Sequence, residues 1–203
     1  MSIPTPLRPH LDLVWIRDPD LDCYELIENG RVNQIIPFTR DIHDRVGPIS
    51  FVGKRQRTLK GQETVVLRTA PHPLFAAKGV IAGLAYYKDE HRYARVVFDY
   101  TMSTIFVETK KAGEAAIIRV RTEGLTQEAN IHFCIKHTET SLEFGYSARD
   151  LFRNGWNFIG TMDTLDLTDR DFTGPCIGVF STARGAEMSD GVSVTLLDFS
   201  VNT

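Results

Sequence analysis

Aromatic, arginine and carboxylate side chains alternate with apolar ones in three consecutive segments, residues 92–100, 104–108 and 115–122. Successive side chains of a β-strand point to opposite faces of the sheet. If the three segments are neighbouring strands, one face carries the polar and aromatic set, which comprises Tyr93, Arg95, Asp99, Phe106, Glu108, Arg119 and Arg121. The opposite face then carries the apolar set, which comprises Ala94, Val96, Phe98, Ile105, Val107, Ile118 and Val120.

The polar and aromatic set offers the groups that bind a polar, ring-shaped molecule. Aromatic rings provide stacking area, and guanidinium groups provide planar arrays of donors. The same pattern also fits a solvated outer face whose strands are joined by ion pairs. The sequence leaves these two interpretations open, and both place Arg95 and Arg119 at the surface.

Three further residues are candidates for the same ligand site. Tyr86 and Tyr87 are adjacent, so one belongs to the core and the other to the opposite face, and we take Tyr87 as the ligand candidate. Arg55 and Gln56 end another strand, where they either contact the ligand or brace the sheet. The predicted ligand-binding residues are Arg55, Gln56, Tyr87, Tyr93, Arg95, Phe106 and Arg119; no catalytic residue is predicted.

Metal and nucleophile chemistry is weakly indicated. The six histidines include no pair with metal-ligand spacing. His132 and Cys134 share a strand face, but residues two apart lie about 7 Å from each other, too far for a catalytic pair. The aspartates of residues 163–171 form acidic turns that could bind calcium. We predict no metal and no cofactor.

Composition sets broad limits on the partners. The net charge of −3 provides no basic surface for nucleic acid, and no apolar run reaches the roughly 20 residues of a membrane span. The N-terminus has neither a basic nor an apolar region typical of a secretory signal. Cys23, Cys134 and Cys176 lack disulfide or zinc spacing. We therefore expect a cytoplasmic protein with three free thiols.

About a dozen short runs rich in β-branched and aromatic residues are bounded by Gly, Asn, Asp or Pro. This pattern predicts an all-β protein with very little helix, the one expected turn of helix being residues 165–169. The polar residues 37–48 are expected to form a surface loop. A chain of 203 residues fits one β-sandwich, so residues 1–203 are interpreted as a single domain.

Motifs along the chain support a more specific interpretation. In order they are Trp15-Ile16-Arg17-Asp18-Pro19, residues 51–56 ending in Arg55-Gln56, Glu63-Thr64, Ala82-Gly83-Leu84-Ala85-Tyr86-Tyr87-Lys88-Asp89, Leu142-Glu143-Phe144-Gly145-Tyr146-Ser147, Trp156-Asn157-Phe158-Ile159-Gly160, Leu167-Thr168-Asp169, Phe172-Thr173-Gly174 and Asp198-Phe199. Together they resemble the C-terminal domain of family forty-three β-xylosidases. Lys54 and the longer residues 148–155 depart from the family pattern.

The resemblance implies a two-sheet antiparallel jelly-roll sandwich of the concanavalin A-like kind, here without the β-propeller that carries the family's catalytic carboxylates. It also implies a module that binds a carbohydrate, or another small polar ring-shaped ligand, in the groove of its concave sheet. The alternative is a cofactor-free intracellular enzyme, an isomerase or cyclase of specialised metabolism, that uses the same groove to hold a reactive conformer.

Overall fold

The computed structural model describes residues 13–27, 31–69, 73–122, 130–148, 155–168, 174–184 and 192–201. These residues form β1 (Val14–Trp15), η1 (Leu21–Cys23), β2 (Tyr24–Ile27), β3 (Arg31–Ile35), β4 (Ser50–Arg55), β5 (Gly61–Arg68), α1 (Pro73–Ala77), β6 (Val80–Asp89), β7 (Arg92–Asp99), β8 (Thr104–Lys110), β9 (Ile117–Arg121), β10 (Asn130–His137), β11 (Ser141–Ser147), β12 (Asn157–Asp163), η3 (Thr164–Leu167), β13 (Cys176–Ala183) and β14 (Val194–Val201). The predicted all-β content is confirmed. The short helix η3 begins one residue before the predicted start at residue 165, whereas the short helices η1 and α1 are not predicted.

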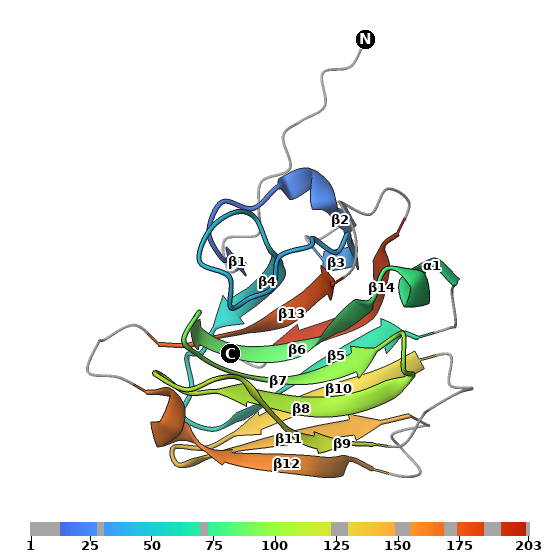
Figure 1. Ribbon diagram of the computed structural model, residues 1–203. Coiled ribbons are helices and arrows are strands. Elements are labelled where there is room, and N and C mark those ends of the chain that lie inside the picture. Colours follow the sequence, from blue (N-terminus) through green and yellow to red (C-terminus); the bar gives the residue numbers. More distant parts are fainter. Residues whose placement is uncertain are drawn as a thin grey trace.

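The strands form two antiparallel sheets of seven strands each, which confirms the two-sheet sandwich that the family resemblance implies (Figure 1). Sheet 1 has the order β1-β4-β13-β6-β7-β8-β9, and sheet 2 has the order β12-β11-β10-β5-β14-β3-β2. The three segments of the polar and aromatic set are neighbours, because β8 pairs with both β7 and β9.

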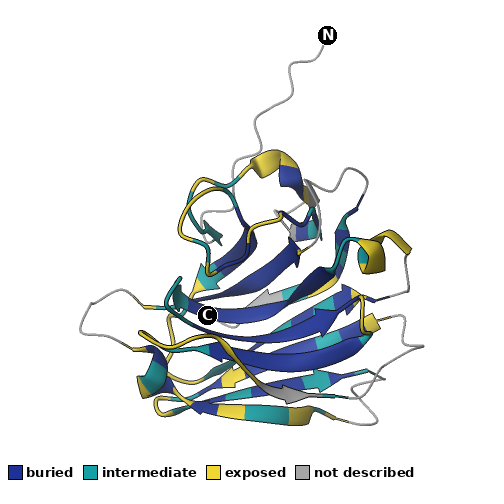
Figure 2. Ribbon diagram, in the orientation of Figure 1, coloured by how far each residue is buried: buried dark blue, intermediate teal, exposed yellow. Residues whose placement is uncertain are grey.

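The main hydrophobic core lies between the sheets. Alternation along β7 and β8 directs Ala94, Val96, Ile105 and Val107 into this core, as predicted. On β10 the apolar Ile131, Phe133 and Ile135 do the same. The central strands of sheet 1 are buried along almost their whole length, whereas much of β12 is exposed or half-buried (Figure 2).

A second buried cluster covers the face of sheet 1 that points away from sheet 2, which we call the outer face. It consists of apolar residues of β4, β6, β7, β8 and β13 that alternate along each strand with residues of the main core, together with Ile42 and Ile49 from the connection between β3 and β4. The prediction that residues 37–48 form a surface loop is therefore wrong for part of this connection, since Asp41 and Ile42 are buried. We call residues 36–49 the cover segment.

One predicted position on sheet 1 is also corrected. Ile118 was expected in the core but is 43% exposed. The register between β8 and β9 shifts between Val107 and Glu108, so that Glu108 pairs with Ile118. Directly opposed residues share a face, and the shift therefore places Ile118 on the side of Glu108.

All three cysteines are free, as predicted, and all three are buried. Burial raises the pKa of Cys23 to about 11 and that of Cys134 to about 12, so neither thiol forms the thiolate that a nucleophile requires near neutral pH. Within the described part of the chain, no helix is long and apolar enough to cross a membrane.

A buried polar network holds the connection between β4 of sheet 1 and β5 of sheet 2, which contains Thr58. His137 Nδ1 lies 3.0 Å from Glu63 Oε2, and its Nε2 lies 3.1 Å from the carbonyl oxygen of Thr58. Since a carbonyl oxygen only accepts, Nε2 carries a hydrogen and donates a hydrogen bond to it. A carboxylate on Glu63 requires an N–H donor at Nδ1 as well. The geometry therefore describes a charged imidazolium.

Burial acts to lower the pKa of His137, but the hydrogen bond and charge of Glu63 outweigh it and raise the pKa above its ordinary value. The charged pair stabilises the folded state fully at a pH below the unfolded-state pKa of His137, about 6.5. This stabilisation is lost as the pH rises through the higher pKa of His137 in the folded state.

We predict that His137→Phe lowers the free energy of unfolding by about 3–5 kcal/mol, because it leaves the Glu63 carboxylate buried and unpaired. Urea unfolding of wild type and variant between about pH 6 and pH 9 measures this effect. The difference between the two proteins should shrink as the pH rises. A difference that is small, or that grows with pH, would contradict the charged pair.

Candidate functional site

The outer face of sheet 1 holds a buried arginine between two carboxylates. Arg95 on β7 is only 1% exposed. Its Nη1 lies 2.5 Å from Asp41 Oδ1 and its Nη2 lies 2.9 Å from Asp41 Oδ2, a bidentate pair with the cover segment. Its Nη2 also lies 2.7 Å from Glu108 Oε1 on the neighbouring strand β8. The cross-strand ion pair considered from the sequence is therefore present, but it is buried rather than solvated.

Aromatic rings surround this ion-pair network. The Arg95 guanidinium lies 5.2 Å from the ring centre of Tyr93 and 4.9 Å from that of Phe180. The Tyr93 hydroxyl donates to Glu108 Oε1 at 2.9 Å. Above it, the exposed His43 ring stacks on Tyr93, with centroids 6.4 Å apart. The rings exclude water from the charges, which strengthens their interaction.

The electrostatics hold the network in its charged form. Burial acts to raise the pKa of Asp41, but the Arg95 guanidinium outweighs it and holds the pKa below its ordinary value. Burial likewise acts to lower the pKa of Arg95, and the two carboxylates reverse this and raise it. Burial raises the pKa of Tyr93, so its hydroxyl stays neutral and donates.

Hydrogen bonds hold both ends of the cover segment. The Phe38 carbonyl accepts from the backbone N–H of Ala183 at 2.8 Å and from the Thr182 hydroxyl at 3.0 Å. At the other end, the Tyr24 hydroxyl donates toward the carbonyl of Ile49 at 3.2 Å. The cover segment is thus fastened to sheet 1 at its start and middle, and its end is held by Tyr24 of β2 in sheet 2.

The predicted ligand residues divide into two groups. Tyr87, Tyr93, Arg95 and Phe106 share the outer face, as predicted, but all four are buried. The expectation that Arg95 is exposed is wrong, because Asp41 and the aromatic rings enclose it. Tyr86 takes the core position beside Tyr87.

The other predicted residues lie at the margins of sheet 1. Arg55 is exposed and donates to the carbonyl of Gly174 at 2.8 Å. Gln56 accepts from the Tyr86 hydroxyl and donates to Thr58, each at 2.8 Å, which supports the bracing interpretation. Arg119 belongs to β9, and its side chain lies outside the described residues. A ligand contact by any of these residues stays a prediction.

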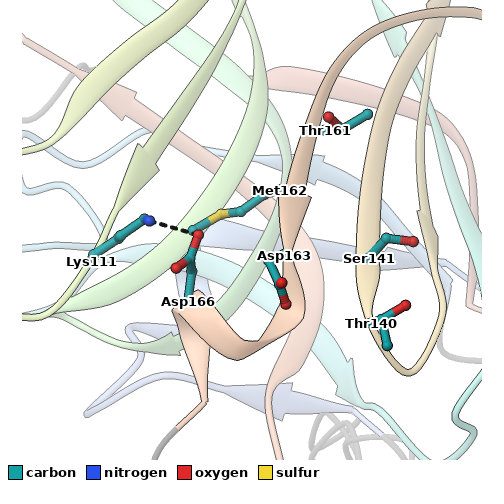
Figure 3. A pocket seen from close by; sticks show the side chains of 7 residues that line it. All are labelled: Lys111, Thr140, Ser141, Thr161, Met162, Asp163 and Asp166. Atoms are coloured by element: carbon teal, nitrogen blue, oxygen red, sulfur yellow. Dashed lines mark ion pairs between the residues drawn. The ribbon is translucent and has the colours of Figure 1, made fainter.

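An open polar cleft of about 480 Å³ lies at the end of the sandwich, beside η3. The cleft is lined by the residue after β8, by the start of β11, by the end of β12 and by η3. The lining residues are Lys111, Thr140, Ser141, Thr161, Met162, Asp163 and Asp166. Figure 3 shows Lys111 and Asp166 on one side and Thr140 and Ser141 on the other. The Lys111 ammonium lies 2.6 Å from Asp166 Oδ2.

Local hydrogen bonds keep the cleft in shape. Asp163 caps η3, since its Oδ1 accepts from the backbone N–H of Leu165 at 2.9 Å. The turn before β11 is joined to η3, because the Thr164 hydroxyl donates to the Glu139 carbonyl at 2.7 Å. A site whose walls are already ordered loses little entropy when a ligand binds.

The sequence indicated only part of this cleft. Asp163 and Asp166 belong to the acidic turns that were considered for calcium, whereas Asp169 and Asp171 lie outside the described residues. No group of three or more potential metal ligands occurs among the described residues. The approach of Lys111 depends on tertiary contacts, and no local motif indicates it.

Comparisons with known proteins agree with this fold. A family model of the β-xylosidase C-terminal concanavalin A-like domain matches residues 8–199. No curated protein matches the sequence.

Solved structures resemble the chain at low sequence identity. A GH43 protein from Bacillus licheniformis has a TM-score of 0.73 at 22% identity over 93% of this chain and 36% of its own. A xylan β-1,4-xylosidase from Bacillus halodurans has a TM-score of 0.68 at 15% identity over 96% and 40%. The carbohydrate-binding module CBM66 from Bacillus subtilis has a TM-score of 0.50 at 9% identity over 87% and 88%.

At these identities the structural likenesses show the fold alone. The chain spans about a third of the length of the GH43 protein from Bacillus licheniformis, since it covers 36% of that chain.

The ion-pair network yields a stability prediction. Arg95→Met should lower the free energy of unfolding by about 3–5 kcal/mol, because it leaves the Asp41 and Glu108 carboxylates buried without their cation. Urea unfolding near neutral pH measures the change.

Lys136→Met is the matched control, because it breaks a half-exposed pair with Glu143 at 3.1 Å and should cost less than about 1 kcal/mol of unfolding free energy. Equal losses in the two variants would contradict the network.

The stability that the Arg95 network provides should also depend on pH. Since the pKa of Asp41 is lowered, wild type should lose this stabilisation only as the pH falls below about 4.

Proposed function

Because the chain belongs to the family of β-xylosidase C-terminal concanavalin A-like domains, we propose that it binds a carbohydrate in the polar cleft beside η3. The observation that carries the proposal is the lining of this open cleft. Its hydroxyls, two carboxylates and one ammonium group can donate to and accept from the hydroxyls of a sugar. Its volume of about 480 Å³ falls within the range of small-molecule sites.

The cleft fits the proposal better than the centre of the outer face does. Asp41 already occupies the Nη atoms of Arg95 that would face a ligand. A sugar at Tyr93, Arg95 or Phe106 would have to displace the cover segment and separate a buried ion pair, which costs several kcal/mol. The cleft requires no such rearrangement.

Lys111 and Asp166 are the residues most suited to orient the sugar. Their ion pair fixes both charged groups at one wall (Figure 3), and a carboxylate accepts hydrogen bonds that are stronger than those between neutral groups. Thr140, Ser141 and Thr161 add hydroxyls to the lining of the cleft. The likeness to CBM66, a carbohydrate-binding module, supports a sugar ligand.

The other expectations from the sequence stay predictions. They are the single domain over residues 1–203, the cytoplasmic location, the absence of a cofactor and the alternative of a cofactor-free isomerase or cyclase. A sugar that is bound and released unchanged would favour the binding module over this alternative.

We predict that Asp166→Asn and Lys111→Met each weaken sugar binding by about tenfold or more, because each removes a charge-assisted hydrogen bond. Isothermal titration calorimetry with xylo-oligosaccharides and a panel of other neutral sugars measures the affinity. Asp163 is left unchanged, because it caps η3.

Glu143→Gln is the control, since Glu143 forms a comparable ion pair outside the cleft. The proposal fails if no sugar binds the wild type, or if Glu143→Gln weakens binding as much as Asp166→Asn does.

A further inference from the structure

A second arginine on the outer face of sheet 1 has buried donors without a partner. Both Nη1 and Nη2 of Arg17 are buried and have no hydrogen-bond partner among the described residues. Arg95, by contrast, directs its Nη atoms to two carboxylates. A buried guanidinium without an anion is unfavourable unless something supplies the missing charge.

The backbone holds Arg17 in an unusual conformation. Its φ of 63° lies in the left-handed region, which non-glycine residues adopt at a cost. The preceding Val14 and Ile16 pack against the outer-face cluster and anchor this turn to the sheet. Strain of this kind persists where the surrounding structure imposes it, and it is often found at ligand sites.

Tyr87 lies next to the guanidinium. Burial raises the pKa of Tyr87 to about 12, and the nearby charge of Arg17 acts in the opposite direction. A side-chain contact with Arg17 acts in the same direction as this charge, yet neither Nη of Arg17 meets the geometry of a hydrogen bond with any described residue. The ring centroids of Tyr87 and Phe51 lie 5.8 Å apart, so aromatic side chains pack together beside this position.

Nearby acidic groups have partners of their own. Asp89 and Glu90 both act on Tyr87. Asp89 accepts from Arg92 at 2.9 and 2.5 Å, and Glu90 lies 3.6 Å from His91. Neither carboxylate pairs with Arg17 in the described structure, so the buried Nη donors have no anionic partner there.

From these observations we propose that Arg17 and Tyr87 form a carboxylate-binding site at the margin of the outer face. The parallel donors of a guanidinium match the two oxygens of a carboxylate, and the neutral Tyr87 hydroxyl supplies a third donor. The ligand class is a small molecule with a free carboxylate. This site differs from the cleft beside η3, whose two carboxylates and one ammonium group disfavour an anion.

Binding of sodium glucuronate, sodium acetate and glucose to wild type, Arg17→Met and Arg68→Met tests the site. Isothermal titration calorimetry and the thermal midpoint are measured at low ionic strength, with matched sodium chloride as the salt control. Arg68 is the control arginine, because it is exposed at the end of β5.

Glucuronate should bind the wild type and raise its midpoint, whereas glucose and sodium chloride should not raise it through this site. Arg17→Met should bind glucuronate about tenfold more weakly or not at all, and its own midpoint should not fall, because the variant removes an unpaired charge. Arg68→Met should behave as wild type. If acetate matches glucuronate, the carboxylate alone is recognised; if only glucuronate binds, an acidic sugar is the ligand.

The proposal is overturned if neither carboxylate binds the wild type. It is also overturned if Arg17→Met binds glucuronate as wild type does, or if this variant unfolds at a much lower temperature. The last result would assign Arg17 a structural role. Arg17→Lys provides a second check, since it keeps the charge, loses the parallel donors and should bind more weakly than wild type.

Discussion

The buried contact between Arg95 and Asp41 determines how the outer face of sheet 1 can be used. A guanidinium enclosed by Tyr93 and Phe180 requires an anion, and Asp41 brings that anion from the cover segment. The contact holds the middle of this segment against the sheet, where Ile42 and Ile49 complete a second hydrophobic cluster. The outer face thereby becomes part of the interior, and the sandwich has two buried layers rather than one.

Because the cover segment occupies the centre of the outer face, the candidate polar binding sites lie at the margins of the sandwich. One margin has the cleft beside η3, with hydroxyls, Lys111 and a pair of aspartates. Another has Arg17, whose donors lack the anion that Arg95 possesses. The two sites differ in the sign of their charge, so they suit different ligands. The same physical requirement, that buried charge be paired, explains why Arg95 is structural and why Arg17 is a candidate for binding.

Local patterns in the sequence predict the sheets well, because the alternation of side chains along a strand is a local property. The faces of β7, β8 and β10 follow from it directly. The burial of Arg95 does not, since it depends on Asp41, which is 54 positions away in the chain. Ile118 was misplaced for a different reason: a register shift at Val107 and Glu108 interrupts the alternation. The cleft was indicated only by its aspartates, because separate connections meet there only in the folded chain.

The central claim is that the cover segment stays in place and that a sugar binds at the cleft. Amide hydrogen exchange with and without a saturating neutral sugar tests it most directly, because backbone protection reports both regions in one experiment. The account predicts slow exchange in residues 38–49 that the sugar does not change, together with new protection in residues 139–141 and 161–167. Faster exchange or new protection in residues 38–49, with no new protection in the cleft residues, would contradict the account. Such a result would indicate that the sugar binds near Arg95 instead.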